Sequence, residues 1–120
     1  MKSFKETYES YRGKKLDSAV AEKANLHKST LSRMKNELIP ANRNYLWSLA
    51  LALELTMGET DTLFTAAGLC MASQYHLTAM EKRREEIIKK HIDQQKYDII
   101  LLNIYLYEHG YKLLGNKGIN

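Results

Sequence analysis

The sequence predicts an all-α protein, and three features of its 120 residues support this fold class. Apolar side chains recur three and four positions apart along most of the chain, which is the period of an amphipathic helix. Residues 3–6 and 56–59 have the spacing of a capping box, in which two side chains satisfy free backbone amides at a helix start. Strand signals are poor, because no region alternates cleanly between apolar and polar residues.

Composition and length together indicate one packed domain. Hydrophobic residues make up 44% of the chain and there is one proline, so a packed, helix-rich core is expected and disorder is not. The length suits one ordinary domain better than two. The first helix is expected to begin after Ser3 and to end at Gly13, with Phe4, Tyr8 and Tyr11 on its inner face.

Residues 17–36 predict two short helices joined by a tight turn, with Asp17 as the N-cap of the first. The inner positions carry small or apolar side chains at helical spacing: Val20, Ala21, Ala24, Leu26, Leu31 and Met34. The outer face of the second helix carries hydrogen-bond donors and positive charge: His27, Lys28, Ser29, Ser32, Arg33 and Asn36. Such a face has the shape and chemistry to enter a DNA major groove.

The segment AEKANLHKSTLSRMK at residues 21–35 resembles the helix-turn-helix of the phage-repressor (Cro-like, XRE) family. The resemblance continues through PANRNYLWSLALALEL and TLFTAAGL, and covers roughly residues 3–69. It implies a five-helix lambda-repressor-like DNA-binding domain at residues 1–69, whose recognition helix begins near His27. Asn25 stands where the family most often has glycine, and asparagine tolerates the left-handed backbone that the turn needs.

Beyond the recognition helix, a loop is expected at residues 37–44 and a central buried helix at residues 45–54, with Trp47 in the core. A fifth helix follows between Thr56 and Gly68. Residues 70–77 are expected to connect it to a helix at about residues 78–95. The predicted inner face of that helix consists of Met80, Ile87, Ile88, His91 and Ile92. Its basic cluster, Lys82, Arg83 and Arg84, is interpreted as a solvated face, with phosphate contact as the alternative.

A last helix is expected at residues 97–109 and, with the one before it, forms a C-terminal helical hairpin at residues 70–120. Its sequence, YDIILLNIYLYEH, is apolar on more than one face, which predicts an exposed patch that a partner covers. The expected dimer or partner interface consists of Ile100, Ile104, Tyr107 and Tyr111. In the alternative interpretation, other helices of one monomer cover both faces. Residues 116–120 are expected to be a frayed tail.

Charge is distributed unevenly along the chain, whose net charge is +4. Residues 1–45 carry ten Lys or Arg against five Asp or Glu, residues 46–80 carry none against three, and residues 81–120 carry eight against six. The excess therefore surrounds the expected recognition helix. Cys70 is the one cysteine, is expected to be buried and inert, and fits a reducing cytoplasm. No signal peptide and no membrane span are expected.

These patterns predict a sequence-specific, double-stranded DNA-binding regulator, a repressor that acts as a homodimer. Arg33 is expected at a base edge, with Lys28, Ser29 and Ser32 beside it in the groove. Asn36, Lys35 and Ser18 are expected to hold phosphates, with Lys14, Lys15 and Arg43 as outer contacts. The alternative is an antitoxin-like or adaptor protein whose last helix binds another protein.

No catalytic or ligand-binding motif accompanies these features in the sequence. The four histidines and Cys70 lack metal-ligand spacing, and there is no phosphate-cradling glycine loop. Glu85 and Glu86 are adjacent, so their side chains diverge on a helix and cannot work as a carboxylate pair. The sequence therefore predicts neither an enzyme nor a cofactor or metal site.

Overall fold

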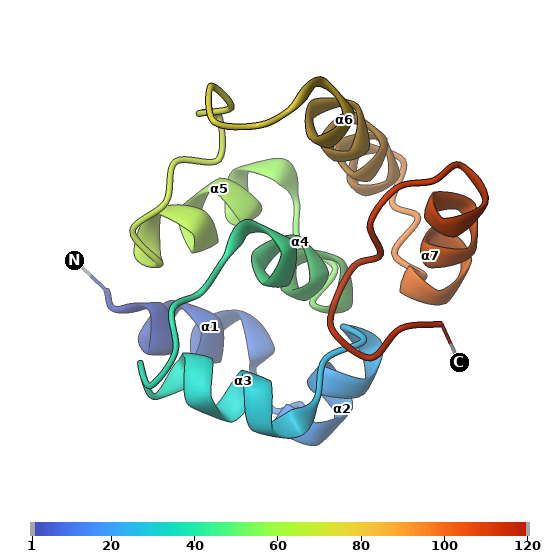
Figure 1. Cartoon of the computed structure of the whole chain (residues 1–120). Coiled ribbons are helices and arrows are strands. Elements are labelled where there is room, and N and C mark those ends of the chain that lie inside the picture. The colour runs from blue at the N-terminus through green and yellow to red at the C-terminus, as the bar shows by residue number, and fades with distance from the viewer. Residues whose placement is uncertain (1, 120) are drawn as a thin grey trace.

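A computed structural model describes residues 2–119, and over that range the chain is all-helical (Figure 1). Its helices, in chain order, are α1 (Phe4–Arg12), α2 (Asp17–Lys23), α3 (Lys28–Lys35), α4 (Arg43–Ala52), α5 (Met57–Ala66), α6 (Ala79–Asp93) and α7 (Ile99–Glu108). The described part of the chain contains no strand, as the sequence predicted. None of the helices in it is long and apolar enough to cross a bilayer.

Side-chain caps start several of the helices. Ser3 and Thr56 form complete capping boxes with the residues three positions on, which confirms the starts expected for α1 and α5. Thr78 and Glu81 form a third box at the start of α6, with the same spacing. The expected cap at Asp17 is wrong, because Leu16 is the N-cap and Asp17 is the first helical residue of α2. Its carboxylate accepts bonds from other side chains instead.

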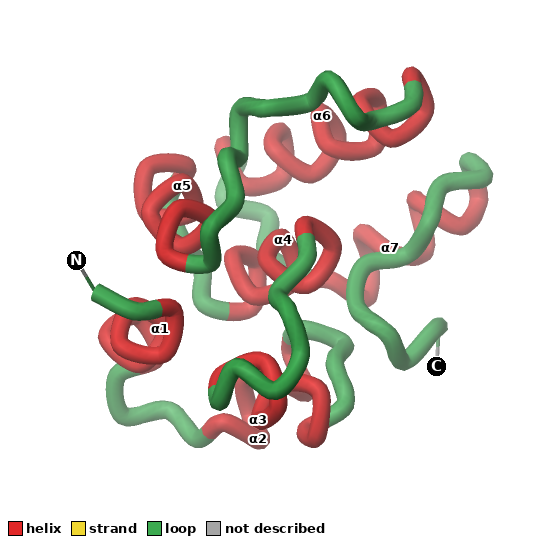
Figure 2. The backbone as a smooth tube through the Cα atoms, turned by 60° about the vertical axis from the view of Figure 1, so that its left-hand side comes forward, coloured by secondary structure: helices red, strands yellow, loops and turns green. Residues whose placement is uncertain are grey.

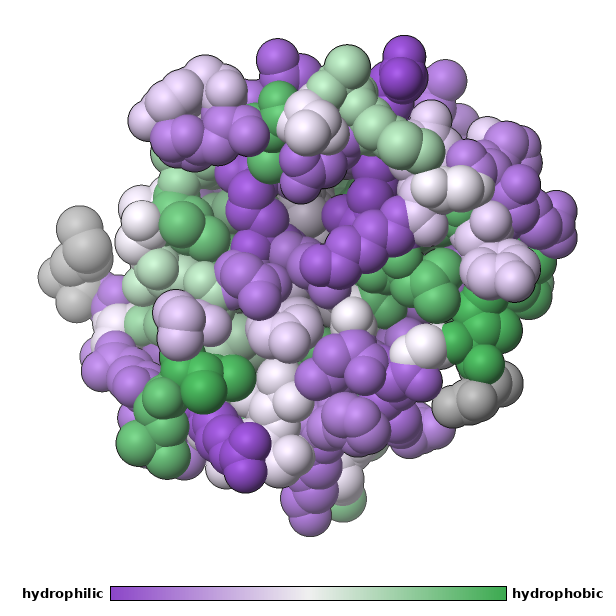
Figure 3. Space-filling view, in the orientation of Figure 1, coloured by the Kyte–Doolittle hydropathy of each residue, from purple (hydrophilic) through white to green (hydrophobic). Residues whose placement is uncertain are grey.

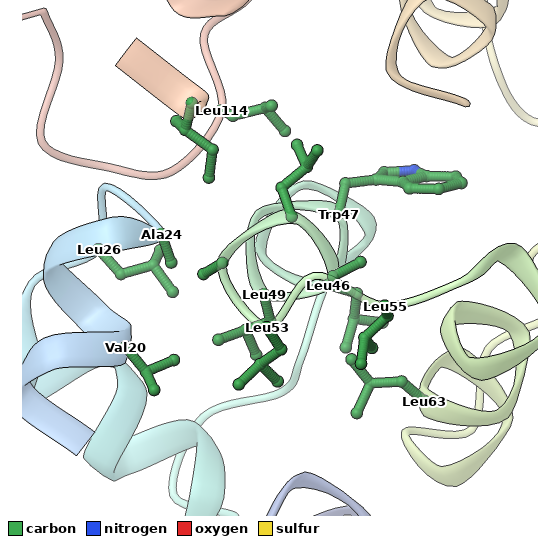
Figure 4. Packing of buried hydrophobic residues seen from close by; sticks show 14 of the residues in the cluster. Val20, Ala24, Leu26, Leu46, Trp47, Leu49, Leu53, Leu55, Leu63 and Leu114 are labelled. Atoms are coloured by element: carbon green, nitrogen blue, oxygen red, sulfur yellow. The ribbon is translucent and has the colours of Figure 1, made fainter. Parts of the chain in front are cut away.

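Helix α4 lies at the centre of the molecule, with the other helices arranged around it (Figures 1 and 2). In Figure 4 its leucines point toward α2 on one side and toward Leu55 and Leu63 on the other. Trp47 is fully buried and meets the Phe64 ring edge-on, with 5.0 Å between the ring centroids, which confirms its place in the core. This packing fixes α2, and through it α3, against a rigid base.

The last two helices pack on the first five more than on each other. Helix α6 packs against α5, and α7 packs against α4. Buried residues of both helices, together with Leu114, belong to the same hydrophobic cluster as the residues of α1 to α5. The expected C-terminal hairpin is therefore not confirmed, and no break in the core separates residues 70–119 from the rest.

Three expectations for the C-terminal half are corrected by the structure. Met80 is exposed, whereas Arg84 and Glu85 are buried on the inner face of α6 beside Ile88. Cys70 is exposed and not buried. The segment expected to be frayed is held by hydrogen bonds through residues 116–118; Asn120, its last residue, lies outside the described range.

Candidate nucleic-acid interface

Helix α3 has one buried face and one solvent face. Thr30, Leu31 and Met34 are buried against the body of the protein. The positions between them point outward, because residues one step away on a helix are rotated by about 100°. The exposed polar residues of this face and its C-cap are Lys28, Ser29, Ser32, Arg33 and Asn36. The structure thus brings together on one surface these five residues, which the sequence analysis predicted to contact DNA.

These five side chains have no hydrogen bond or ion pair with any residue in the range 2–119. Other basic side chains nearby are engaged: Lys23 bonds to Glu54 and Arg12 to Asp17. Lys28 and Arg33 therefore keep their donors for a ligand. Figure 3, in which α7 is on the right, shows hydrophobic residues on that side and a second hydrophobic group at the lower left, by the C-terminal end of α3.

The turn between α2 and α3 has the geometry that a steep helix crossing requires. Asn25 has φ of 57°, in the left-handed region, as expected for this position. Ala21, Ala24 and Leu26 are almost fully buried, and the small alanine side chains let the two helices approach closely. His27 is the N-cap of α3, but its side chain makes no capping bond.

Lys35 occupies a different environment from the one expected. Its ammonium lies 2.7 Å from Oδ2 of Asp17, and its side chain is 15% exposed. Tyr8 and Arg12 donate to Oδ1 of the same carboxylate, each at 2.8 Å. Partial burial opposes ionisation of Asp17, but the bonds from Lys35, Arg12 and Tyr8 outweigh it and hold the pKa of Asp17 well below its usual range. Lys35 thus joins α3 to α1 and α2, and its charge is already matched within the protein.

Arg43 is also occupied by protein groups, which corrects its expected role as an outer contact. It is the first residue of α4, and its guanidinium bonds to both carboxylate oxygens of Glu85, at 2.7 and 2.5 Å. The same guanidinium donates to the carbonyls of Cys70, Met71 and Ser73. Burial disfavours the charged carboxylate, yet the bonds from Arg43 lower the pKa of Glu85. This pair ties α4 to α6.

The basic cluster of α6 is divided by the fold. Lys82 and Arg83 are exposed, in agreement with a solvated face. Arg84 is buried and donates to Oδ1 of Asn44 at 2.6 Å and to the Lys112 carbonyl at 2.7 Å. Burial lowers the pKa of the Arg84 guanidinium. A signal for this position exists in the sequence, because residue 84 lies four positions before Ile88 and eight before Ile92 on one helix face.

Three further residues predicted near DNA are exposed. Ser18 lies in the first turn of α2, and Lys14 and Lys15 lie in the link between α1 and α2. Lys14 and Lys15 thus precede α2, and Ser18 is its second residue. They remain candidates for contacts with a phosphate backbone.

Helix α7 has a buried face, formed by Ile99, Leu102 and Leu106, and an exposed apolar face. The apolar side chains of the exposed face are 39–69% exposed: Ile100, Leu101, Ile104, Tyr105 and Tyr107. Tyr111, also expected at the interface, is half-buried against the core. The other helices of the monomer therefore do not cover both faces of α7. We call these five exposed residues the α7 stripe.

No family model, curated protein or solved structure matches this chain. Within residues 2–119, no group of three or more His, Cys, Asp or Glu side chains is placed to hold a metal ion. The functional argument rests on the surface of α3 and on the α7 stripe.

Proposed function

We propose that this chain is a sequence-specific, double-stranded DNA-binding regulator, a repressor with a lambda-repressor-like helix-turn-helix built from α1 to α5. The observation that carries the proposal is the solvent face of α3. It presents the donors of Lys28, Ser29, Ser32 and Arg33, which have no partner among the described residues 2–119, on a helix whose other face is packed into the core. A helix of this kind fits the major groove, where each base pair shows a distinct pattern of donors and acceptors.

The outward residues take different roles in this proposal. Arg33 lies on the exposed face, and its guanidinium suits the O6 and N7 acceptors of guanine. Lys28, Ser29 and Ser32 reach the groove floor or its walls. Asn36 and Ser18, with Lys14 and Lys15, hold the phosphate backbone on either side. Lys35 and Arg43 are no longer included, because Asp17 and Glu85 occupy them.

The α7 stripe supports a homodimer as the binding form. The exposed apolar residues of the stripe carry no charge, so two copies related by a two-fold axis can meet there without like-charge repulsion. Stable interfaces bury about 800 Å² per partner, and five large half-exposed side chains supply an apolar centre for one. A dimer would also match a two-fold operator.

Selection of binding sequences from random duplexes, with the wild type and Arg33→Ala, tests the proposal. The wild type should enrich one half-site. The Arg33→Ala variant should lose preference at one base position of it, by about tenfold, since a good bidentate pair gives roughly 1–3 kcal/mol of discrimination. Arg83→Ala removes the same kind of exposed side chain from α6 and should leave the enriched sequence unchanged. Failure of the wild type to enrich any sequence would contradict the proposal.

A further inference from the structure

The chain after α7 folds back onto the turn of the helix-turn-helix. Figures 1 and 2 show residues 111–119 running from the end of α7 toward the connection between α2 and α3. Leu114 is fully buried and belongs to the same core cluster as Ala24 and Leu26, and Figure 4 shows these buried side chains around α4. The Asn25 side chain donates to the carbonyls of Leu114 and Gly118, at 2.9 and 3.0 Å. In return, the backbone N–H of Asn116 donates to the backbone carbonyl of Asn25 at 2.9 Å.

The Asn116 side chain makes two bonds at the start of α3. Its Oδ1 accepts from the backbone N–H of His27 at 3.0 Å, and its Nδ2 donates to Oγ1 of Thr30 at 2.8 Å. His27 itself provides no side-chain cap. Asn116, which is 89 residues away along the chain from His27, therefore fixes the first turn of α3 from outside the helix-turn-helix.

Gly115 makes this approach possible. It has φ of +82°, which L side chains rarely adopt. A Cβ built on it would lie 2.1 Å from the Asn25 carbonyl oxygen, too close for any side chain. The backbone of the segment thus touches the backbone of the turn, and Asn116 follows directly with its side chain in reach of His27.

The segment is itself held firmly by the C-terminal helices. Asn103 on α7 and the backbone of Leu114 exchange two bonds, at 2.8 and 3.1 Å, and both residues are buried. Arg84 on α6 bonds to the carbonyls of Lys112 and Leu113. A segment anchored in this way restrains whatever it contacts, because it has lost its own conformational freedom in the folded state.

We propose that Asn116 is a positioning residue for DNA recognition: it holds the first turn of α3, and with it Lys28 and Ser29, in the geometry that reads base edges. The inference rests on the proposed function. Residues at the N-terminal end of a recognition helix contact base edges, and those contacts depend on accurate placement. Phosphate contacts are longer-ranged and carry no sequence information, so they tolerate a mobile helix end. Asn116 therefore contributes to specificity more than to non-specific affinity.

The experiment compares wild type, Asn116→Ala, Thr30→Val and the double variant on the selected duplex and on a scrambled one. Thr30→Val removes the acceptor of the Nδ2 bond and keeps the side-chain volume. Asn116→Ala should weaken binding to the selected duplex by about tenfold, as expected for the loss of two bonds, and binding to the scrambled duplex by less than about twofold. The effects of the two single variants should not add, because they share one bond. Thr78→Ala is the matched control, since it removes a cap from α6 and should lower only the melting temperature.

Hydrogen exchange gives a readout that does not depend on DNA. The Thr30 and Leu31 amides, which bond to the His27 carbonyl, should exchange faster in Asn116→Ala, while the Leu46 amide in α4 should not. Unchanged exchange at Thr30 and Leu31 overturns the inference, and so do equal losses of affinity on both duplexes. A wild type that binds no selected duplex overturns the proposed function and, with it, the role of Asn116 in DNA recognition. The exchange result still decides separately whether Asn116 holds the first turn of α3. If Asn116→Ala does not fold, Thr30→Val decides both readouts.

Discussion

Asp17 lies on α2, yet its carboxylate helps to hold α3 in place. Its carboxylate joins Lys35 of α3 to Tyr8 and Arg12 of α1, across the start of α2. Burial, and then the bond to Asp17, raise the pKa of the Tyr8 hydroxyl, which therefore stays protonated and donates. Two basic residues of α3 therefore differ: Lys35 is paired with Asp17, whereas Arg33 has no hydrogen bond or ion pair with any residue in the range 2–119.

Asp17→Asn should destabilise the fold by about 2 kcal/mol at neutral pH, because hydrogen bonds to a charged acceptor are replaced by weaker ones. The pKa of Asp17 is lowered on folding, so its contribution is present above the unfolded value of about 3.9 and is lost as pH falls through the folded value. The difference in free energy of unfolding between wild type and variant should therefore be largest above about pH 5 and should narrow below about pH 4.

Urea unfolding at a series of pH values measures this difference. Asp61→Asn is a suitable control, because Asp61 is exposed on α5 and has no hydrogen bond or ion pair to another residue in the range 2–119. A gap between wild type and Asp17→Asn that is the same at pH 3 and pH 7 would contradict the assignment of the stabilisation to the charged carboxylate.

At the scale of the element, α7 has one face fixed by the core and one face that nothing in the described chain covers. Leu102 and Leu106 are buried, whereas Ile100 and Tyr107 are mostly exposed. Asp98 caps the helix and the residues up to Tyr107 carry no formal charge at neutral pH, so the helix forms without surface ion pairs. An apolar stripe of this extent on a small protein normally marks an interface.

Ile100→Asp combined with Ile104→Asp should convert the proposed dimer into a monomer, because each copy would then bury two unpaired charges at the interface. Mass measured in solution gives the result, and circular dichroism should show unchanged helix content. Tyr75→Asp is the matched control, since Tyr75 is 79% exposed but lies outside the stripe. A wild type that is monomeric at high concentration and binds a second protein through the stripe would favour the adaptor alternative.

At the scale of the whole molecule, residues 111–119 join α6 and α7 to the turn between α2 and α3. Leu114 completes the core beside α2 and α4, and its backbone satisfies the buried Asn103 side chain. Helices α2 and α3 are therefore packed against residues that lie beyond the first 69. The first 69 residues do not have a core of their own that excludes the rest.

Ending the chain after Gly110 should lower the free energy of unfolding by about 3 kcal/mol or more, because it removes a fully buried leucine and leaves Asn103 unpaired in the core. Thermal unfolding of the truncated and full chains measures the effect. Ending the chain after Gly118 keeps these contacts and serves as the control. An unchanged melting temperature for the shorter chain would show that residues 111–119 contribute little to the fold.

The sequence by itself determined the helices and the outward face of α3. Periodicity and caps depend on neighbours three or four positions apart, so Ser3, Thr56 and the alternation of Leu31 with Ser32 and Arg33 could be interpreted without a structure. The same local logic predicted that α7 has more apolar surface than one packing contact covers.

Only the tertiary structure decided which basic side chains are paired with a carboxylate of the same protein. Lys35 and Arg43 resemble Lys28 and Arg33 in the sequence, but their partners, Asp17 and Glu85, lie 18 and 42 residues away. The anchoring of Asn116 at the start of α3 depends in the same way on a fold that brings together positions 89 residues apart. Contacts of this kind follow from how the helices pack around α4, and no local pattern in the sequence specifies them.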